Sequence, residues 1–360
     1  MRQIWTDEYY MRMALDLALR GMGKTTPNPL VGCVLVKDGK VVGRGWHDHL
    51  GGLHAEAAAL VDAGERAKGA TAYVTLEPCS HQGRQPPCAP ALVRAEIARC
   101  VCAIGDPNPK VSGRGLNILR DAGIETVCGV LADEAAWMNR GFLSLQTRAR
   151  PWVTLKAAVS ADGSMCLANG ESRWVTGAAA RAAGQLLRSE NDAILTGSGT
   201  LEHDDPALTV RDVEGVSPRP VILCRDLRCL SKNYNALNER SIVFGGEGAA
   251  VPDEWSGRVF LVPETADGAL DLEALPEPAE GLAGGGVPAF RERLVPDAVA
   301  ARVRGADGEP GRRRPVLRGH DDRRTPLRDR AQLAREIEAD AREVLEERIH
   351  AEQRRALDAR

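Results

Sequence analysis

Apolar residues recur at two different spacings along the first fifty residues. Between Glu8 and Arg20 they fall every three or four positions, which predicts an amphipathic helix. Two β-rich runs follow, Val31–Val36 and Val41–Trp46, and the residues between them include Asp38-Gly39. An Asp-Gly pair readily adopts the positive φ angles of a tight turn, so the two runs are predicted to form a hairpin.

Strand and helix patterns then alternate. The predicted order is a helix from about His54, a strand at Ala72–Leu76, a helix from about Ala89, a strand at Cys100–Ile104, a helix near Leu116–Ala122, a strand at Ile124–Val130 and a helix from about Asp133. Such alternation is typical of an α/β layer with helices packed on a largely parallel sheet.

A second α/β unit is predicted after the polar stretch Thr147–Pro151, which is interpreted as a linker. Its predicted elements are a strand at 152–158, a helix at about 178–189, and strands at 192–196, 220–224, 241–245 and 258–262. The predicted domains are therefore residues 1–147 and 151–275.

The hydrophobic pattern is lost near Leu275. The segment Pro276–Arg360 is rich in arginine and contains no lysine, and its first half is also rich in glycine and proline. This composition is typical of a solvated or disordered segment. Residues Asp329–Arg360 are predicted to form an exposed, highly charged helix.

Composition narrows the functional classes. A chain of 360 residues with 43% hydrophobic residues has material for two domain cores. Forty-seven basic and fifty acidic residues give a net charge of −3, so nucleic acid and anionic membranes are not expected partners, and a small charged ligand remains open. No apolar run has the length of a membrane span, and Met1–Glu8 lacks the apolar centre of a signal peptide, so we expect a cytoplasmic protein.

Nine cysteines, an odd number spread irregularly, favour reduced thiols over a disulfide framework, with some of them as metal ligands. His54 and Cys88 are predicted at helix starts, and Cys79 follows a strand. One imidazole and two thiolates make three zinc ligands and leave the fourth tetrahedral position for water, as in catalytic zinc sites. Glu56, two residues after His54, is placed to take a proton from that water and deliver it to a leaving amine.

The pattern is close to the signature of zinc nucleobase deaminases, H-x-E with P-C-x-x-C, in which the glutamate is the acid/base. Here eight residues, Ser80 to Pro87, separate the cysteines instead of two. A structural zinc or merely buried cysteines are the alternatives, but a structural site normally has a fourth protein ligand.

Longer motifs contain these residues. They are Thr26-Pro27-Asn28-Pro29-Leu30-Val31-Gly32-Cys33, His54-Ala55-Glu56, Glu77-Pro78-Cys79-Ser80-His81-Gln82-Gly83-Arg84-Gln85-Pro86-Pro87-Cys88 and Asp106-Pro107-Asn108-Pro109. Together they closely resemble the bifunctional riboflavin-biosynthesis deaminase–reductases, a family whose pattern includes the long insert between the cysteines. The resemblance runs from about Asp7 to Arg211.

The resemblance implies that the first domain has a cytidine-deaminase-like three-layer fold. It also implies zinc-dependent removal of the 2-amino group of 2,5-diamino-6-(5-phosphoribosylamino)pyrimidin-4(3H)-one, with zinc held by His54, Cys79 and Cys88 and with Glu56 protonating the departing ammonia. The family's substrate contacts fall on Asn28, His47, His81, Arg84, Asp106 and Asn108.

For the second domain the resemblance implies a dihydrofolate-reductase-like α/β fold that uses NADPH to reduce the ribosyl side chain, giving 5-amino-6-(5-phosphoribitylamino)uracil. No G-x-G-x-x-G follows a strand, so a Rossmann fold has no support. The matching motifs are Lys156-Ala157-Ala158-Val159-Ser160-Ala161-Asp162-Gly163, Gly170-Glu171-Ser172-Arg173-Trp174-Val175-Thr176 and Asp204-Asp205-Pro206-Ala207-Leu208-Thr209-Val210-Arg211. The glycine-containing stretch Thr196–Thr200 is predicted to be either a loop that brings backbone N–H groups close to a phosphate or a plain glycine turn. Cofactor contacts fall on Ala158, Trp174, Thr200 and Asp204, and substrate contacts on Ser172, Arg188, Leu208 and Arg211.

The C-terminal part is atypical for that family. The hydrophobic strand, the Glu-Ala-Gly-Pro motif and the closing strands that the resemblance implies are replaced by arginine-rich sequence. We hypothesise a changed reading frame or gene end here, and we expect weak or absent NADPH turnover. Three hypotheses about the function remain: the riboflavin-pathway enzyme with an intact or disabled reductase, a zinc deaminase that acts on another nucleobase, and a non-catalytic zinc-stabilised module. The resemblance also implies self-association into a homo-oligomer.

Overall fold

The computed structural model describes residues 6–83, 85–108, 111–149, 151–160, 163–167, 169, 171, 174–266 and 268–271. The predicted arginine-rich segment, its terminal helix and the change of pattern near Leu275 lie outside the described residues. The domain boundaries at 147, 151 and 275 remain predictions. Within the part described, no helix is long and apolar enough to span a membrane.

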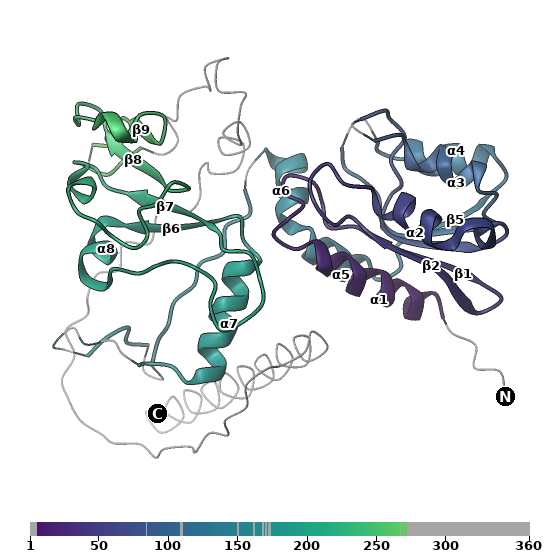
Figure 1. Cartoon of the computed structure of the whole chain (residues 1–360), viewed down its shortest axis with the longest axis horizontal. Coiled ribbons are helices and arrows are strands. Elements are labelled where there is room, and N and C mark those ends of the chain that lie inside the picture. Colours follow the sequence, from purple (N-terminus) through teal and green to yellow (C-terminus); the bar gives the residue numbers. More distant parts are fainter. Residues whose placement is uncertain are drawn as a thin grey trace, which may run out of the picture. The chain divides into compact units, whose positions relative to one another are not determined.

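The first sheet has five strands in the order β2-β1-β3-β4-β5 (Figure 1). The strands are β1 Gly32–Lys37, β2 Lys40–Trp46, β3 Thr71–Leu76, β4 Arg99–Ile104 and β5 Glu125–Cys128. β1 runs antiparallel to β2 and β3, and β3, β4 and β5 are parallel. The helices of this part are α1 Asp7–Ala18, α2 Ala55–Ala63, α3 Cys88–Arg94, α4 Arg114–Asp121, α5 Ala132–Met138 and α6 Arg140–Arg148, with 3-10 turns at Leu19–Gly21 and Gly64–Ala67.

The predicted hairpin is confirmed. Its turn residues Asp38 and Gly39 both have positive φ, 50° and 73°, as a two-residue turn between twisted strands requires. Lys37 and Lys40 pair across the end of the ladder.

Alternate residues of each strand pack into two separate cores. Cys33 and Leu35 contribute to a core with α2, α3 and α4, whereas Val34 and Val36 contribute to a core with α1 and α5. Successive side chains of a strand point to opposite faces, so this alternation covers the sheet on both sides (Figure 1). The result is a three-layer α/β/α arrangement.

A glycine brings the helix that begins after His54 close to the sheet. A Cβ atom on Gly45 of β2 would lie 2.2 Å from the backbone oxygen of Ala55, far inside van der Waals contact. Only a residue without a side chain permits this approach, so Gly45 sets the depth at which the first turn of α2, which carries Glu56, is buried.

The second sheet has four parallel strands in chain order, β6-β7-β8-β9 (Figure 1). They are β6 Ala193–Gly197, β7 Arg219–Leu223, β8 Ile242–Gly246 and β9 Val259–Val262, accompanied by α7 Ala178–Ser189, α8 Ser198–Asp204 and 3-10 turns at Arg228–Ser231 and Asp253–Trp255. Leu201, Ile222 and Val243 join α8, β7 and β8 in one core. The predicted helix at 178–189 and the strands near 192, 220, 241 and 258 are therefore confirmed.

Three local predictions are wrong. The predicted strand at 152–158 is absent: these residues form no strand and pair with no strand in the described part of the chain. Thr147 and Arg148, predicted as linker, belong to α6, which ends at Arg148 before Ala149 takes a positive φ. The predicted loop Thr196–Thr200 does not exist as a loop, since β6 passes directly into α8 at Ser198.

Candidate active site

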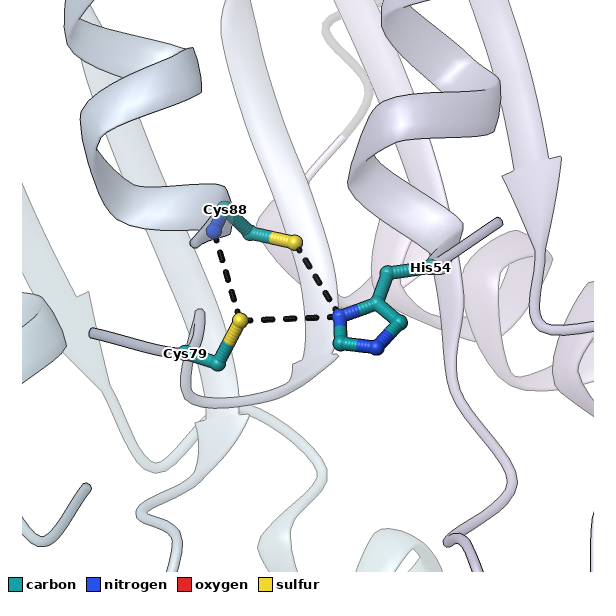
Figure 2. Close-up of side chains that lie close together, drawn as sticks. All are labelled: His54, Cys79 and Cys88. Atoms are coloured by element: carbon teal, nitrogen blue, oxygen red, sulfur yellow. Dashed lines mark hydrogen bonds between the residues drawn. The ribbon is translucent and has the colours of Figure 1, made fainter. Parts of the chain in front are cut away.

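Three segments of the domain built on the five-stranded sheet converge at one end of that sheet. His54 is the residue before α2, Cys79 follows the end of β3, and Cys88 is the first residue of α3. Figure 2 shows the two sulfur atoms and the imidazole facing one another. The structure thus brings together the three predicted zinc ligands, which are 25 and 9 residues apart along the chain.

The spacing of the three ligand atoms fits a tetrahedral zinc ion. Nδ1 of His54 lies 3.5 Å from Sγ of Cys79 and 3.4 Å from Sγ of Cys88. With Zn–S bonds of about 2.3 Å and Zn–N bonds of about 2.0–2.1 Å, tetrahedral geometry places nitrogen and sulfur about 3.6 Å apart. Among the described residues these three form the one group of metal-ligating side chains with mutual distances within 4.8 Å.

The electrostatics of the group favour a charged sulfur beside the imidazole. Hydrogen bonds from Cys88 lower the pKa of Cys79 to about 4. Cys79 in turn raises the pKa of His54 through a hydrogen bond. The backbone N–H of Cys88 also lies 3.3 Å from the Cys79 sulfur, so the start of α3 stabilises negative charge there.

Glu56 lies inside this site rather than on the surface. Its side chain is only 4% exposed, and it hydrogen-bonds to Cys88. Burial raises its pKa to about 7, and the charge of Cys79 adds to the effect. A carboxyl group with a pKa near neutrality can both accept and donate a proton, as the acid/base role predicted for Glu56 requires.

Asn28 and His47 adjoin the zinc ligands. Nδ2 of Asn28 lies 3.0 Å from Nε2 of His47, and the His47 ring contacts the His54 ring edge-on with centroids 5.7 Å apart. The segment carrying Asn28 is fixed by Asn139, whose buried amide accepts from the N–H of Leu30 at 2.8 Å and donates to its carbonyl at 2.9 Å. Asn139 was not predicted as a functional residue, because a lone polar residue in the helical region that starts near Asp133 has no distinctive signal in the sequence.

The Asp106-Pro107-Asn108 segment lies beside Cys79. Asp106 interacts electrostatically with Cys79 and His81, and burial raises the pKa of its carboxyl group. Its side chain accepts a hydrogen bond from the N–H of Asn108 at 2.9 Å. His81 is exposed at the edge of the same region. Arg84 lies outside the described residues.

In the domain built on the four-stranded sheet, two of the predicted substrate contacts, Arg188 and Arg211, are neighbours. Arg188 is half-buried, and its pKa is lowered by burial and by the positive charge of Arg211. Its Nη1 donates to the carbonyl of Thr209 at 3.0 Å, and the backbone N–H of Arg211 donates to Gln185. Leu208, which lies between these two arginines in the sequence, is buried and has a φ of 52°.

The predicted cofactor contacts are less closely grouped. Thr200 and Asp204 lie one turn apart on α8. Ala158 lies in residues 151–160, outside any helix or strand. Trp174 is 74% exposed and carries the Arg181 guanidinium 4.6 Å from its ring centre. Ser172 lies outside the described residues.

A cavity that the sequence did not predict lies where β6 and β7 end. It has a volume of about 310 Å³ and is lined by Ser198, Leu223, Arg225, Asp226, Arg228, Gly268, Ala269 and Leu270. The cavity is largely open to solvent and lies outside the carboxyl ends of these parallel strands, the side of such sheets on which ligands bind. The arginines gave no signal in sequence because the chain contains many of them.

Comparison with known proteins agrees with this geometry. Residues 5–104 match the cytidine and deoxycytidylate deaminase zinc-binding region, and residues 151–251 match the RibD C-terminal domain. The fold and the three-ligand site thus define a zinc deaminase-like domain followed by a dihydrofolate-reductase-like domain, as predicted. The second match extends beyond Arg211, where the resemblance read from the sequence ended.

Solved structures identify the family. The chain aligns with RibD of Acinetobacter baumannii at 43% identity and a TM-score of 0.63, over 72% of this chain and 74% of that one. It aligns with a Thermotoga maritima diaminohydroxyphosphoribosylaminopyrimidine deaminase/5-amino-6-(5-phosphoribosylamino)uracil reductase at 38% identity and a TM-score of 0.64, over 68% and 72%. The chain belongs to the RibD family.

Curated relatives match over a shorter range. Riboflavin biosynthesis protein RibD of Escherichia coli is 56% identical over 205 residues, and that of Aquifex aeolicus is 50% identical over 207 residues. These alignments cover 57% and 58% of this chain, and 56% and 58% of the relatives. The chain therefore spans less than two thirds of the length of the curated relatives it matches.

Proposed function

We propose that the first domain deaminates 2,5-diamino-6-(5-phosphoribosylamino)pyrimidin-4(3H)-one. The observation that carries the proposal is the convergence of His54, Cys79 and Cys88 at zinc-ligand distances with the buried carboxyl of Glu56 beside them. Three protein ligands leave one position open, which distinguishes a catalytic from a structural zinc site. The substrate follows from membership of the RibD family and from the deaminase activity named for the Thermotoga maritima relative.

Each residue has a task in this reaction. His54, Cys79 and Cys88 would hold a zinc ion, which would lower the pKa of a water molecule and so supply a nucleophile at neutral pH. Glu56 takes the proton of that water and delivers it to the departing ammonia, for which its pKa of about 7 is suited. Asn28, His47, Asp106 and Asn108 hold the pyrimidine, and His81 and Arg84 meet the phosphate.

The second domain is proposed to reduce the ribosyl side chain of the deaminated product with NADPH. Arg188 and Arg211 support this: within the described part of the chain neither forms an ion pair, so both charges are available to a phosphate. Ser172 and Leu208 complete the proposed substrate contacts, and Ala158, Trp174, Thr200 and Asp204 the proposed cofactor contacts. A cytoplasmic location and a homo-oligomeric state are part of the same proposal.

A paired assay of the full chain tests both activities. Ammonia release from the diaminopyrimidine phosphate and NADPH oxidation with the deaminated product are measured separately. Both activities together support the whole proposal. Ammonia release without NADPH oxidation supports the deaminase activity and indicates that the reductase is disabled because of the atypical C-terminal sequence. A zinc-loaded protein that releases no ammonia from this substrate, but does so from another nucleobase, overturns the substrate assignment.

A further inference from the structure

Glu77 is a buried carboxylate with no place in the reaction described above. It follows Leu76, the last residue of β3, and is 4% exposed. Its own N–H donates to the carbonyl of Ile104 at 2.9 Å, which continues the pairing of β3 with β4. Its side chain therefore lies between the ends of these two strands, two residues from a proposed zinc ligand.

Four backbone N–H groups converge on this carboxylate. Oε2 accepts from Asp106 at 3.3 Å and from Gly113 at 3.0 Å, and Oε1 accepts from Gly115 at 2.9 Å and from Leu116 at 3.4 Å. The first donor belongs to the segment after β4 that carries the proposed substrate contacts. The others belong to the start of α4. One side chain thus ties two separate stretches of backbone to the strand that carries the metal site.

The start of α4 packs closely against the backbone next to Glu77. A Cβ atom on Gly115 would lie 1.9 Å from the carbonyl oxygen of Pro78 and 3.3 Å from Oε1 of Glu77. The first turn of α4 is therefore in direct backbone contact with the Glu77-Pro78-Cys79 segment. A Cβ atom on Gly105 would lie 3.6 Å from Oε2 of Glu77, an ordinary van der Waals distance, so the start of the Asp106 segment also lies against this carboxylate.

We propose that Glu77 is a positioning residue of the deaminase: through its four backbone hydrogen bonds it holds Asp106 and the first turn of α4 in register with Cys79. The inference rests on the proposed function, because Asp106 matters to catalysis only if it contacts the pyrimidine. Glu77 touches neither the substrate nor the metal in this role. It acts through the placement of Asp106.

Glutamate is required because all four groups that face it are donors. An ionised carboxylate offers only acceptors and can take about four hydrogen bonds. Glutamine has the same shape but replaces one oxygen with an NH₂ group, which is a donor. Either Asp106 and Gly113, or Gly115 and Leu116, would then face a donor, and that stretch of backbone must move away.

The test is steady-state deamination kinetics of the full-length Glu77→Gln protein, together with its zinc content and its deuterium uptake over residues 105–116. The matched control is Asp7→Asn, which weakens the opposite end of β4, where Asp7 pairs with Arg99, and leaves this segment alone. We expect KM to rise about tenfold to a hundredfold and kcat to change less than about threefold, because misplaced contacts lose binding that substrate and transition state share. Zinc content should equal that of the parent, and deuterium uptake over 105–116 should be faster.

A KM within about twofold of the parent overturns the inference, and so does an equal rise of KM in Asp7→Asn, which would show a general effect of lowered stability. If Glu77→Gln cannot be recovered folded, Gly113→Ala decides. Gly113 has a φ of 80° with open space around its Cβ position, so alanine strains the same backbone while keeping its N–H. It should raise KM in the same direction by a smaller factor, and an unchanged KM overturns the inference. A parent protein that releases no ammonia overturns the proposed function itself.

Discussion

Asn28 and His47 form a hydrogen bond whose direction the surroundings determine. Nδ1 of His47 lies 3.0 Å from the carbonyl oxygen of Leu53, which can only accept, so Nδ1 carries the proton. Nε2 of the neutral ring is then an acceptor, and the Asn28 amide donates to it at 3.0 Å. Burial lowers the pKa of His47, which keeps the ring neutral at pH 7. His47 therefore presents one defined tautomer beside His54.

The first prediction concerns this tautomer. Nitrogen NMR of the parent at pH 7 should show Nδ1 of His47 protonated and Nε2 unprotonated. Replacing Asn28 with aspartate places an acceptor against an acceptor, so the pKa of His47 should rise as a second proton enters between them. Asn117→Asp, on the exposed side of α4, is the control and should leave the His47 signals unchanged. An unprotonated Nδ1 in the parent would contradict the assignment.

The second prediction concerns proton transfer by Glu56. Glu56→Gln keeps the shape of the side chain but cannot exchange a proton, so kcat for ammonia release should fall about 10²–10⁴-fold. Zinc content should stay at the parent level, because Glu56 is not a ligand. Glu65→Gln, an exposed glutamate in the following 3-10 turn, should retain parental kcat. Full activity of Glu56→Gln would instead favour a non-catalytic zinc module.

The third prediction concerns the metal. Cys79→Ser removes a thiolate ligand, and serine is a far weaker zinc ligand at neutral pH, so the purified variant should contain much less than one zinc per chain. Cys128→Ser is the matched control, since Cys128 is an exposed cysteine at the end of β5, and it should retain the parental zinc content. Treatment of the parent with a chelator should abolish ammonia release, and added zinc should restore it. Equal zinc content in the two cysteine variants would refute the ligand set.

The fourth prediction concerns stability at low pH. Asp7 accepts hydrogen bonds from Arg99 at 2.8 and 2.9 Å and from Tyr73 at 2.9 Å, and the Arg99 bond lowers the pKa of Asp7 below its ordinary value of 3.8. A carboxyl group whose pKa is lower in the folded state stabilises the protein above its unfolded-state pKa, and this contribution is lost as the pH falls through the folded-state pKa.

Asp7→Asn should therefore lower the free energy of unfolding at pH 7 by roughly 1 kcal/mol, as expected of a partly exposed ion pair. The difference from the parent should begin to shrink below about pH 4, where Asp7 becomes protonated in the unfolded state, and should be lost as the pH falls through the lower pKa of the folded state. Urea denaturation of both proteins over about pH 3–7 measures the difference. A difference independent of pH would mean that shape rather than charge stabilises this contact.

Most elements of both sheets could be predicted from the sequence, because hydrophobic periodicity and turn residues act over short distances. The Asp38-Gly39 turn and helix α7 are examples. The segment 152–158 was mispredicted for the complementary reason: its apolar residues suit a strand, but strand formation depends on a partner that local pattern cannot reveal. The stretch Thr196–Thr200 was mispredicted because its glycines suit a loop as well as the start of a helix.

The sequence by itself determined the chemistry of the metal site. His54, Glu56, Cys79 and Cys88 are recognisable because few residue types bind zinc or move protons at neutral pH, and their spacing identified the family. Only the tertiary structure decided what supports them. Glu77 and Asn139 act on backbone groups far away in the chain, Asp106 and Leu30 among them. Such hydrogen bonds depend on how strands and helices pack, and backbone N–H and carbonyl groups are the same at every residue, so the sequence carries no mark of where they will be needed.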